Sequence, residues 1–466
     1  MPTATEPKTA PHLSETEASE TATVKDNPKK KIGFVHLGCP KNLVDTETML
    51  GVLGKNNHEI VSDESVADIV LVNTCAFIES AQKESVEVLA NLAEQGKELL
   101  ITGCLAQKFE GELLDLFPEA KAVVGVNNIN EIASVVERVN QGERVLATQQ
   151  DKQYLLEEDN IRQQVTMGAF SYLKIAEGCD YKCSFCIIPS MRGSFRSRSI
   201  DNLVQNAREM AERGVSEIIL VGQDTTSYGK DMGSSLPDLL YALNEIPALK
   251  WLRFMYAYPN LASDELLEAI NNCEKVVKYL DCPMQHSHPD VLRRMRRPVT
   301  DMQEFAERVR SKIENVKLRT SFIVGFPGET EAHYQHLKET IQTVEWDRLG
   351  IFEYSDIDSS HSKALDGKVP PFVIKQRRNA LMALQQEIAY KKNKALVGKT
   401  IPTLIDYVNE YGTLIGRTQW DAPEVDNSVL AKGQAIPGEI VPIKVSAVTP
   451  YDLKGVVVSN ESLSGI

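Results

Sequence analysis

The sequence predicts an α/β protein with an N-terminal doubly wound parallel domain, a central open (βα)6 partial barrel of the TIM type and a small C-terminal antiparallel β-barrel. Two observations predict the first two parts: strand-like apolar runs alternate with helical patterns over residues 31–145, and again over residues 165–395. The third part follows from a change after residue 397, where Val, Ile and Thr alternate with polar residues between Gly and Pro turns.

Length and composition fit such a chain. The 466 residues predict two to four domains, and 42% hydrophobic with 25% charged residues is ordinary for a globular protein. We expect a cytoplasmic protein with no membrane partner, because no apolar run approaches the roughly 18 residues that span a bilayer and no export signal opens the chain. We also expect a monomer. The eight cysteines should then be free thiols that serve metals or catalysis. A net charge of −14 argues against nucleic-acid binding by bulk electrostatics.

The N-terminal part begins with residues 1–30, which are poor in large apolar side chains and predict a disordered tail. Helices are expected at about 42–53 and 80–94, and strands that alternate with them imply a parallel sheet. The expected strands are Lys31–Leu37, Asp68–Asn73, Glu98–Thr102 and Ala122–Val126. A polar, Gln-rich stretch at about 140–165 predicts the linker to the next domain.

The central part, residues 165–395, repeats this alternation six times, which predicts an open partial barrel. The expected strands are Tyr172–Ala176, Glu217–Val221, Trp251–Met255, Tyr279–Cys282, Arg319–Val324 and Gly350–Tyr354. Pro370 and Pro371 introduce a long helical run over 372–396. In the tail, residues 397–466, alternating segments such as Thr400–Val408 predict a five-stranded, OB-like barrel.

Three cysteines lie within eight residues, at Cys179, Cys183 and Cys186, directly after an expected strand. Three thiolates on one tight loop can hold three corners of a 4Fe–4S cluster, which leaves one iron open to bind and activate a substrate. The alternative is a zinc site, which normally needs four ligands, and no second Cys pair or His pair lies nearby.

Three more cysteines, Cys39, Cys75 and Cys104, each follow an expected parallel strand by one to three residues. That edge of an open parallel sheet is where ligands bind, and adjacent strands are only about 4.8 Å apart, so the three loops can converge on a second cluster. The alternative is that all three are buried core cysteines, although such residues would be expected inside strands. Cys273 and Cys282 receive no role.

The spacing of Cys179, Cys183 and Cys186, with Phe185 before the last of them, resembles the signature of radical S-adenosylmethionine (SAM) enzymes. Residues 31–466 as a whole resemble the radical SAM methylthiotransferase family, in which the C-terminal barrel is a TRAM domain. The resemblance extends to these segments: Leu37-Gly-Cys-Pro-Lys-Asn42, Val221-Gly-Gln-Asp224, Tyr256-Ala-Tyr-Pro259, Pro283-Met-Gln-His286 and Val324-Gly-Phe-Pro-Gly-Glu-Thr330.

This resemblance implies two 4Fe–4S clusters and SAM as cofactors. One cluster would cleave SAM to a 5′-deoxyadenosyl radical, and the other would supply a sulfur that has already been methylated. A reductant protein such as flavodoxin or ferredoxin would deliver electrons. The resemblance also implies that Gly222, Gln223 and Asp224 contact SAM and that Phe185 packs by its adenine. The open alternatives are that Asp224 is a helix N-cap and that Phe185 fills the core.

Within this family, one branch modifies the β-carbon of an aspartate on ribosomal protein twelve of the small subunit, and others modify a prenylated or threonylcarbamoylated adenosine in tRNA. The segment Gly38-Cys-Pro-Lys-Asn42 resembles the ribosomal-protein branch; the tRNA enzymes have a different pair after the cysteine. Residues 395–466 carry five Lys/Arg against eight Asp/Glu, a net charge of −3 that suits a basic protein better than tRNA.

Two arginine clusters leave the tRNA alternative open, since either could contact RNA. The first is Arg192, Arg196 and Arg198, and the second is Arg293, Arg294, Arg296 and Arg297.

Overall fold

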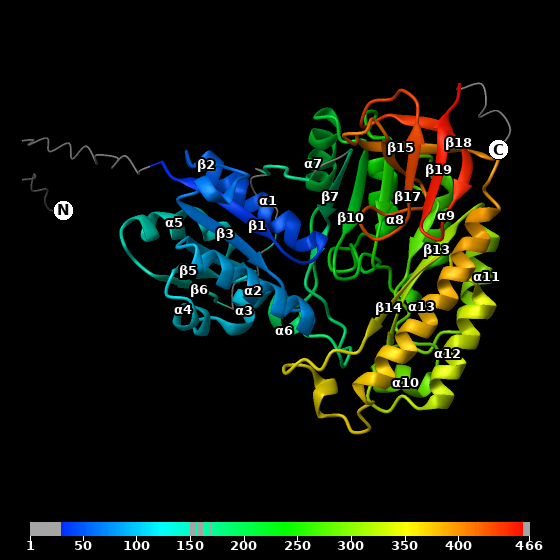
Figure 1. Cartoon of the computed structure of the whole chain (residues 1–466), viewed down its shortest axis with the longest axis horizontal. Helices are drawn as coiled ribbons and strands as arrows, with labels where there is room; N and C mark the ends of the chain where they lie inside the picture. Colours follow the sequence, from blue (N-terminus) through cyan, green and yellow to red (C-terminus); the bar gives the residue numbers. More distant parts are fainter. Residues whose placement is uncertain (1–28, 150–154, 156–161, 167–168, 460–466) are drawn as a thin grey trace, which may run out of the picture.

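The computed structural model describes residues 29–149, 155, 162–166 and 169–459. Residues 1–28 of the predicted tail and most of the polar part of the predicted linker lie outside the described residues. Figure 1 shows the N-terminal domain on the left, the central partial barrel on the right and the small C-terminal barrel above it. In the described part of the chain, no helix is both long and apolar enough to cross a bilayer.

The N-terminal sheet has six parallel strands in the order β2-β1-β3-β4-β5-β6. The strands are β1 (Lys31–His36), β2 (Glu59–Ile60), β3 (Ile69–Thr74), β4 (Glu98–Gly103), β5 (Ala120–Val124) and β6 (Val145–Ala147). Four of them match the strands expected from the sequence. The sequence missed β2 and β6, because two or three residues are too few to show a periodic pattern.

Helices cover both faces of this sheet, which confirms the doubly wound fold. Alternate residues of β3 point to opposite faces, so Val70 and Val72 join one core cluster while Ile69 and Leu71 join the other. The first face is covered by α2 (Glu79–Glu94), α3 (Cys104–Phe109) and α4 (Glu112–Leu116), and the second by α1 (Pro40–Lys55) and α5 (Ile132–Asn140).

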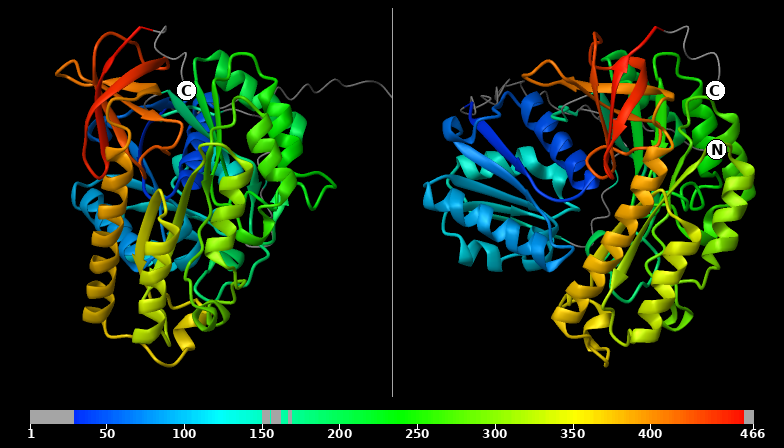
Figure 2. Two further views of the ribbon diagram at one scale, coloured as in Figure 1. Left: turned by 90° about the vertical axis from the view of Figure 1, so that its right-hand side faces the viewer. Right: turned by 45° about the vertical axis from the view of Figure 1, so that its right-hand side comes forward.

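The central domain contains the six expected strands side by side in chain order, which confirms the (βα)6 partial barrel (Figure 2). They are β7 (Phe170–Lys174), β10 (Glu217–Val221), β11 (Trp251–Phe254), β12 (Tyr279–Asp281), β13 (Lys317–Val324) and β14 (Arg348–Glu353). The helices are α7 (Ile200–Glu212), α8 (Leu236–Asn244), α9 (Asp264–Asn272), α10 (Pro289–Arg294), α11 (Met302–Lys312), α12 (Glu331–Val344) and α13 (Pro371–Lys394).

The C-terminal barrel is closed, in the order β15-β16-β17-β19-β18. Its strands are β15 (Thr400–Val408), β16 (Leu414–Thr418), β17 (Ser428–Lys432), β18 (Ile440–Val448) and β19 (Asp452–Val457). The expected antiparallel barrel is confirmed at four of its five strand pairs, and the exception is β17 and β19, which run parallel. Because a closed ring of five strands contains an odd number of strands, their directions cannot alternate all the way round, and at least one neighbouring pair must be parallel.

One apolar cluster joins all three domains. It contains Val44 from α1, Tyr172 and Val221 from the inner face of the partial barrel, and Leu404 and Ala422 from the C-terminal barrel, all buried. Burial of this shared surface stabilises the three domains as one body, because each would otherwise expose apolar side chains to water. The carboxyl edge of the N-terminal sheet is thereby held against the central domain.

A buried carboxylate ties the C-terminal barrel to the central sheet. Glu217, on β10, accepts hydrogen bonds from Arg253 Nε (2.7 Å) and Arg417 Nη1 (2.6 Å), and its side chain is fully buried. Burial alone raises the pKa of Glu217, but the two guanidinium groups outweigh burial and hold the pKa below its ordinary value. Since Arg417 belongs to β16, this carboxylate links two domains.

Replacing Glu217 by Gln should lower the free energy of unfolding by about 3–5 kcal/mol at pH 7, because the buried Arg253 loses its counter-charge and the buried Arg417 keeps only its pair with Asp406. Because the folded-state pKa is depressed, the contribution of Glu217 is present above its unfolded pKa and is lost as the pH falls through the folded pKa. Urea unfolding of the two proteins measures the difference. Glu212→Gln, at the exposed end of α7, is the matched control. Equal midpoints for Glu217→Gln and wild type would contradict the link.

Candidate functional site

The first cysteine triad, Cys39, Cys75 and Cys104, lies along one edge of the N-terminal sheet. Cys39 precedes α1, Cys75 directly follows β3, and Cys104 directly follows β4 as the first residue of α3. The three preceding strands, β1, β3 and β4, are neighbours in the sheet, so their carboxyl ends meet. Gly38 adopts a φ of +101°, and a Cβ there would lie 2.9 Å from Cys75 Cβ, so only glycine allows this approach.

The thiols of the first triad influence one another. Burial, with smaller contributions from the neighbouring Cys104 and Cys39, raises the pKa of Cys75 to about 11. Burial also raises the pKa of Cys104, which the Arg192 guanidinium partly offsets. Such thiols hold their protons at neutral pH, so binding a metal cation as thiolates must displace those protons.

The second triad, Cys179, Cys183 and Cys186, occupies the loop between β8 (Ala176–Glu177) and α6 (Ile188–Arg192). The loop is closed by backbone hydrogen bonds from Cys179 N to Gly193 O (3.1 Å) and from Cys186 N to Cys183 O (3.1 Å). Burial raises the pKa of Cys179 to about 11 and that of Cys186 to about 12.

Both triads fit a multi-iron cluster better than a single zinc ion. In the described residues, neither triad gathers its three sulfur atoms within 4.8 Å of one another. A zinc ion with Zn–S distances of about 2.3 Å would require that approach. In a cubane cluster each cysteine binds a different iron, so the thiols stand further apart, and three thiols leave the fourth iron open.

A pocket of about 380 Å³ lies beside the second triad. Its lining includes Cys179, Tyr181, Phe195, Asp224, Ser227 and Lys230. Asp224 accepts hydrogen bonds from Thr226 N (2.9 Å) and Ser227 Oγ (2.5 Å). These bonds make a turn, and no helix starts at Asp224, so the alternative of a helix N-cap is wrong.

The other residues assigned to SAM by resemblance lie near the pocket but are not part of its lining. Gln223 Nε2 donates to Glu177 Oε1 (2.8 Å), while Gln223 Oε1 is buried without a partner. A Cβ at Gly222 would meet no atom closer than 3.8 Å, so close packing does not explain that glycine. Phe185 packs against a buried cluster that includes Met295 and Phe326, as its core alternative expected.

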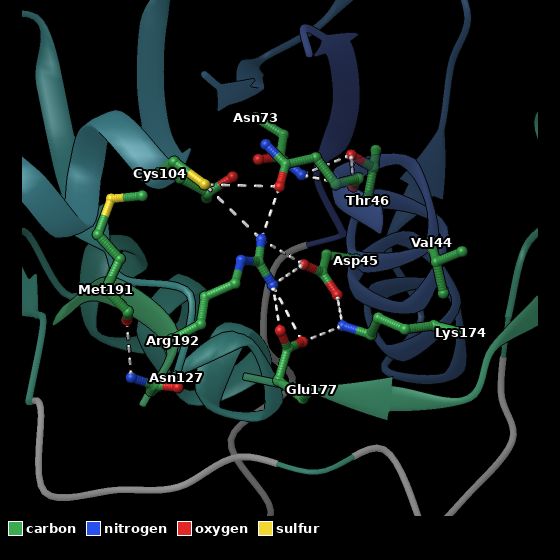
Figure 3. Close-up of polar contacts among 12 residues, drawn as sticks. Val44, Asp45, Thr46, Asn73, Cys104, Asn127, Lys174, Glu177, Met191 and Arg192 are labelled. Atoms are coloured by element: carbon green, nitrogen blue, oxygen red, sulfur yellow. Dashed lines mark hydrogen bonds and ion pairs between the residues drawn. The ribbon is translucent and has the colours of Figure 1, made fainter. Parts of the chain in front are cut away.

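A buried polar network joins the first triad to the central domain (Figure 3). Arg192, on α6, donates to Asp45 Oδ2 (3.2 Å), to Glu177 (3.0 Å) and to Asn42 Oδ1 (2.6 Å), and its Nη2 lies 3.7 Å from Cys104 Sγ. Lys174, on β7, forms ion pairs with both Asp45 and Glu177. Two cations thus balance two carboxylates, and all four side chains are at most 4% exposed.

The network crosses the domain boundary, since Asn42 and Asp45 come from α1 while Arg192, Lys174 and Glu177 come from the central domain. Sequence reasoning missed its role. The only local signal is Lys174, a charged residue inside an apolar strand, which indicates a buried ion pair.

The first arginine cluster does not form an RNA-binding surface. Arg192 and Arg198 are buried, and Arg198 Nη1 donates to Lys174 O (2.8 Å), so these charges serve the interior. In the second cluster, Arg297 approaches the second triad: its Nη1 lies 4.0 Å from Cys183 Sγ, and its guanidinium carbon lies 4.0 Å from the centre of the Tyr258 ring.

Cys273 and Cys282 are 1% exposed and belong to the main apolar core of the central domain. Burial raises the pKa of Cys282 far above its ordinary value, so this thiol stays neutral. Both residues serve as small apolar side chains.

Comparison with known proteins matches three family models in chain order. These are the "Uncharacterized protein family UPF0004" over residues 31–125, the "Radical SAM superfamily" over 173–341 and the "TRAM domain" over 397–458. The ribosomal protein uS12 methylthiotransferase RimO of Synechococcus sp. (strain CC9902) is 46% identical, and the match covers 96% of this chain and 98% of that protein. The RimO protein of Thermosynechococcus vestitus is 47% identical, with 92% and 98% covered.

Among solved structures, the radical SAM methyltransferase TsrM from Kitasatospora setae, with cobalamin and a 4Fe–4S cluster bound, has a TM-score of 0.54. It is 13% identical, and the match covers 70% of this chain and 75% of that one. At this identity the likeness shows a shared fold alone.

Proposed function

Because the chain belongs to the family of ribosomal protein uS12 methylthiotransferases, we propose that it attaches a methylthio group to the β-carbon of an aspartate in uS12. The observation that carries the proposal is a contact across the domain boundary, where Arg192, on the helix that follows the second triad, reaches Cys104 of the first triad. Two separate cysteine triads serving one reaction must face a common space, and this contact supports the proposal because it packs the domain of the second triad against the first triad.

The protein's residues hold two cofactors in this proposal. Cys179, Cys183 and Cys186 hold the cluster that with SAM supplies the 5′-deoxyadenosyl radical, and Cys39, Cys75 and Cys104 hold the cluster that supplies the methylated sulfur. A radical is needed because the target C–H bond is too weakly acidic for a general base. The pocket lined by Asp224 and Tyr181 is the proposed SAM site, where the Asp224 carboxylate would pair with the SAM ammonium.

The partners follow from the substrate. Ribosomal proteins are rich in Lys and Arg, and the net charge of −3 over residues 395–466 favours their approach. The buried positions of Arg192 and Arg198 remove one of the two basic clusters that a tRNA substrate would have used. We further propose that the protein works in the cytoplasm as a monomer, with flavodoxin or ferredoxin as reductant.

Mass spectrometry of ribosomes from cells that lack this chain tests the proposal. We expect uS12 to be lighter by about 46 Da, the mass of an added SCH2 unit. The wild-type gene should restore this mass, and the Cys183→Ala gene should not. Unchanged uS12 together with a missing modification on a tRNA nucleoside would contradict the proposal.

A further inference from the structure

Lys41 stands at an unfavourable position for a cation. It is the second residue of α1, a helix of 16 residues whose first turn contains no acidic side chain. The N-terminus of a helix carries a partial positive charge, so a lysine there destabilises the helix rather than supporting it. The residue therefore needs an explanation outside helix stability.

The Lys41 ammonium forms no ion pair among the described residues, and the Glu177 carboxylate that acts on it is already paired with Lys174 and Arg192. Its Nζ lies 3.8 Å from the centre of the Tyr256 ring, and neither a hydrogen bond nor an ion pair is formed with any of those residues. The nearby Arg192 and Lys174, in contrast, are both neutralised by Asp45 and Glu177. Lys41 is only partly exposed, so its charge is left without full hydration and without an ion-pair partner of its own.

The backbone of Tyr256 is strained. It lies two residues beyond the end of β11 and adopts a φ of +64°, a left-handed conformation that is strained for a tyrosine. Its backbone N donates to Asp281 Oδ2 (2.9 Å), which fixes the turn. The ring thus presents its face to the Lys41 ammonium from the opposite domain, and a cation over an aromatic face keeps its hydrogen-bond donors available.

Lys41 also lies close to a cysteine of each triad. It is two residues from Cys39 of the first triad, and its charge acts on Cys186 of the second. The substrate carbon must come to this space, because it receives sulfur from one side and loses hydrogen to the other. An unpaired cation at that place suits a substrate that brings a negative charge.

We propose that Lys41, presented by Tyr256, binds the carboxylate of the target aspartate. The inference rests on the proposed function and identifies how the site selects its substrate. A charge-assisted hydrogen bond from Nζ to the carboxylate holds the neighbouring β-carbon in the space between the triads. A prenylated adenosine offers no carboxylate, which gives the lysine of the Gly38-Cys-Pro-Lys-Asn42 segment a role in separating the protein substrate from such a tRNA.

Binding measurements with the cluster-loaded enzyme test this role. The enzyme is titrated, without reductant, with purified uS12 and with uS12 in which the target aspartate is replaced by asparagine. We expect wild type to bind the aspartate form about tenfold or more tightly than the asparagine form. Lys41→Met should bind both forms equally, and Lys41→Arg should keep the preference because it keeps the charge. Lys83→Met, an exposed lysine on α2, is the matched control and should behave as wild type.

Iron content and visible absorption report whether each variant still carries its clusters, so a damaged site is not mistaken for lost recognition. If Lys41→Met retains the wild-type preference, or if wild type has none, the inference is overturned while the proposed function stands. If wild type fails to methylthiolate uS12 at all, the proposed function fails and the inference fails with it.

Discussion

Replacing Cys183 by alanine should abolish the cleavage of SAM while the cluster of the N-terminal domain remains. Cys183 is the central member of the second triad, and the loop that carries it belongs wholly to the central domain. With two thiols left, that cluster loses one of its three protein ligands. The first triad sits on another sheet and keeps all of its thiols.

The measurement combines iron analysis with release of 5′-deoxyadenosine under reducing conditions. Wild type should carry about eight irons and Cys183→Ala about four. Cys273→Ala is the matched control, since it removes a thiol from the apolar core of the same domain and should leave both iron content and cleavage intact. Retained SAM cleavage in Cys183→Ala would show that the cluster is held elsewhere.

Replacing Cys75 by alanine should separate the two halves of the reaction. Cys75 follows β3 in the N-terminal domain, whereas the pocket lining around Asp224 and Tyr181 comes from the central domain. We therefore expect Cys75→Ala to cleave SAM but to form no methylthio product, because the sulfur-donating cluster is lost while the radical-forming one remains.

Product is measured as the mass of uS12 after incubation with SAM and reductant, and 5′-deoxyadenosine is measured in the same sample. Cys282→Ala, a buried core thiol, controls for the loss of a cysteine as such. Normal product from Cys75→Ala would make the first triad dispensable and the two-cluster scheme wrong.

The cysteines illustrate how far the sequence reaches. The second triad is a local motif, because its three residues share one loop whatever the rest of the chain does. The convergence of the first triad could be predicted only through the fold. Alternating strands and helices require a parallel sheet, and a parallel sheet brings the carboxyl ends of its strands to one edge. The structure shows that β1, β3 and β4, the strands before the three cysteines, are neighbours in the sheet, as this prediction requires.

Other features had no local signal. The strands β2 and β6 pair through backbone hydrogen bonds that two or three residues of any composition can make. The parallel pair of β17 and β19 follows from closure of an odd-membered ring, which no segment encodes by itself. The arginines after the second triad could be interpreted as a surface charge cluster, because the sequence does not show whether an arginine is buried in an ion pair or exposed to solvent.

By itself, the sequence determined the three-part architecture and the six thiols, because strand periodicity and short cysteine spacing are properties of neighbouring residues. Only the tertiary structure decided that Arg192 reaches Cys104 and that Lys41 rests on Tyr256. These pairs come from different domains, more than 80 residues apart in the chain. Their contacts depend on how two folded surfaces pack, and a buried cation is recognisable as paired or unpaired only when its neighbours in space are known.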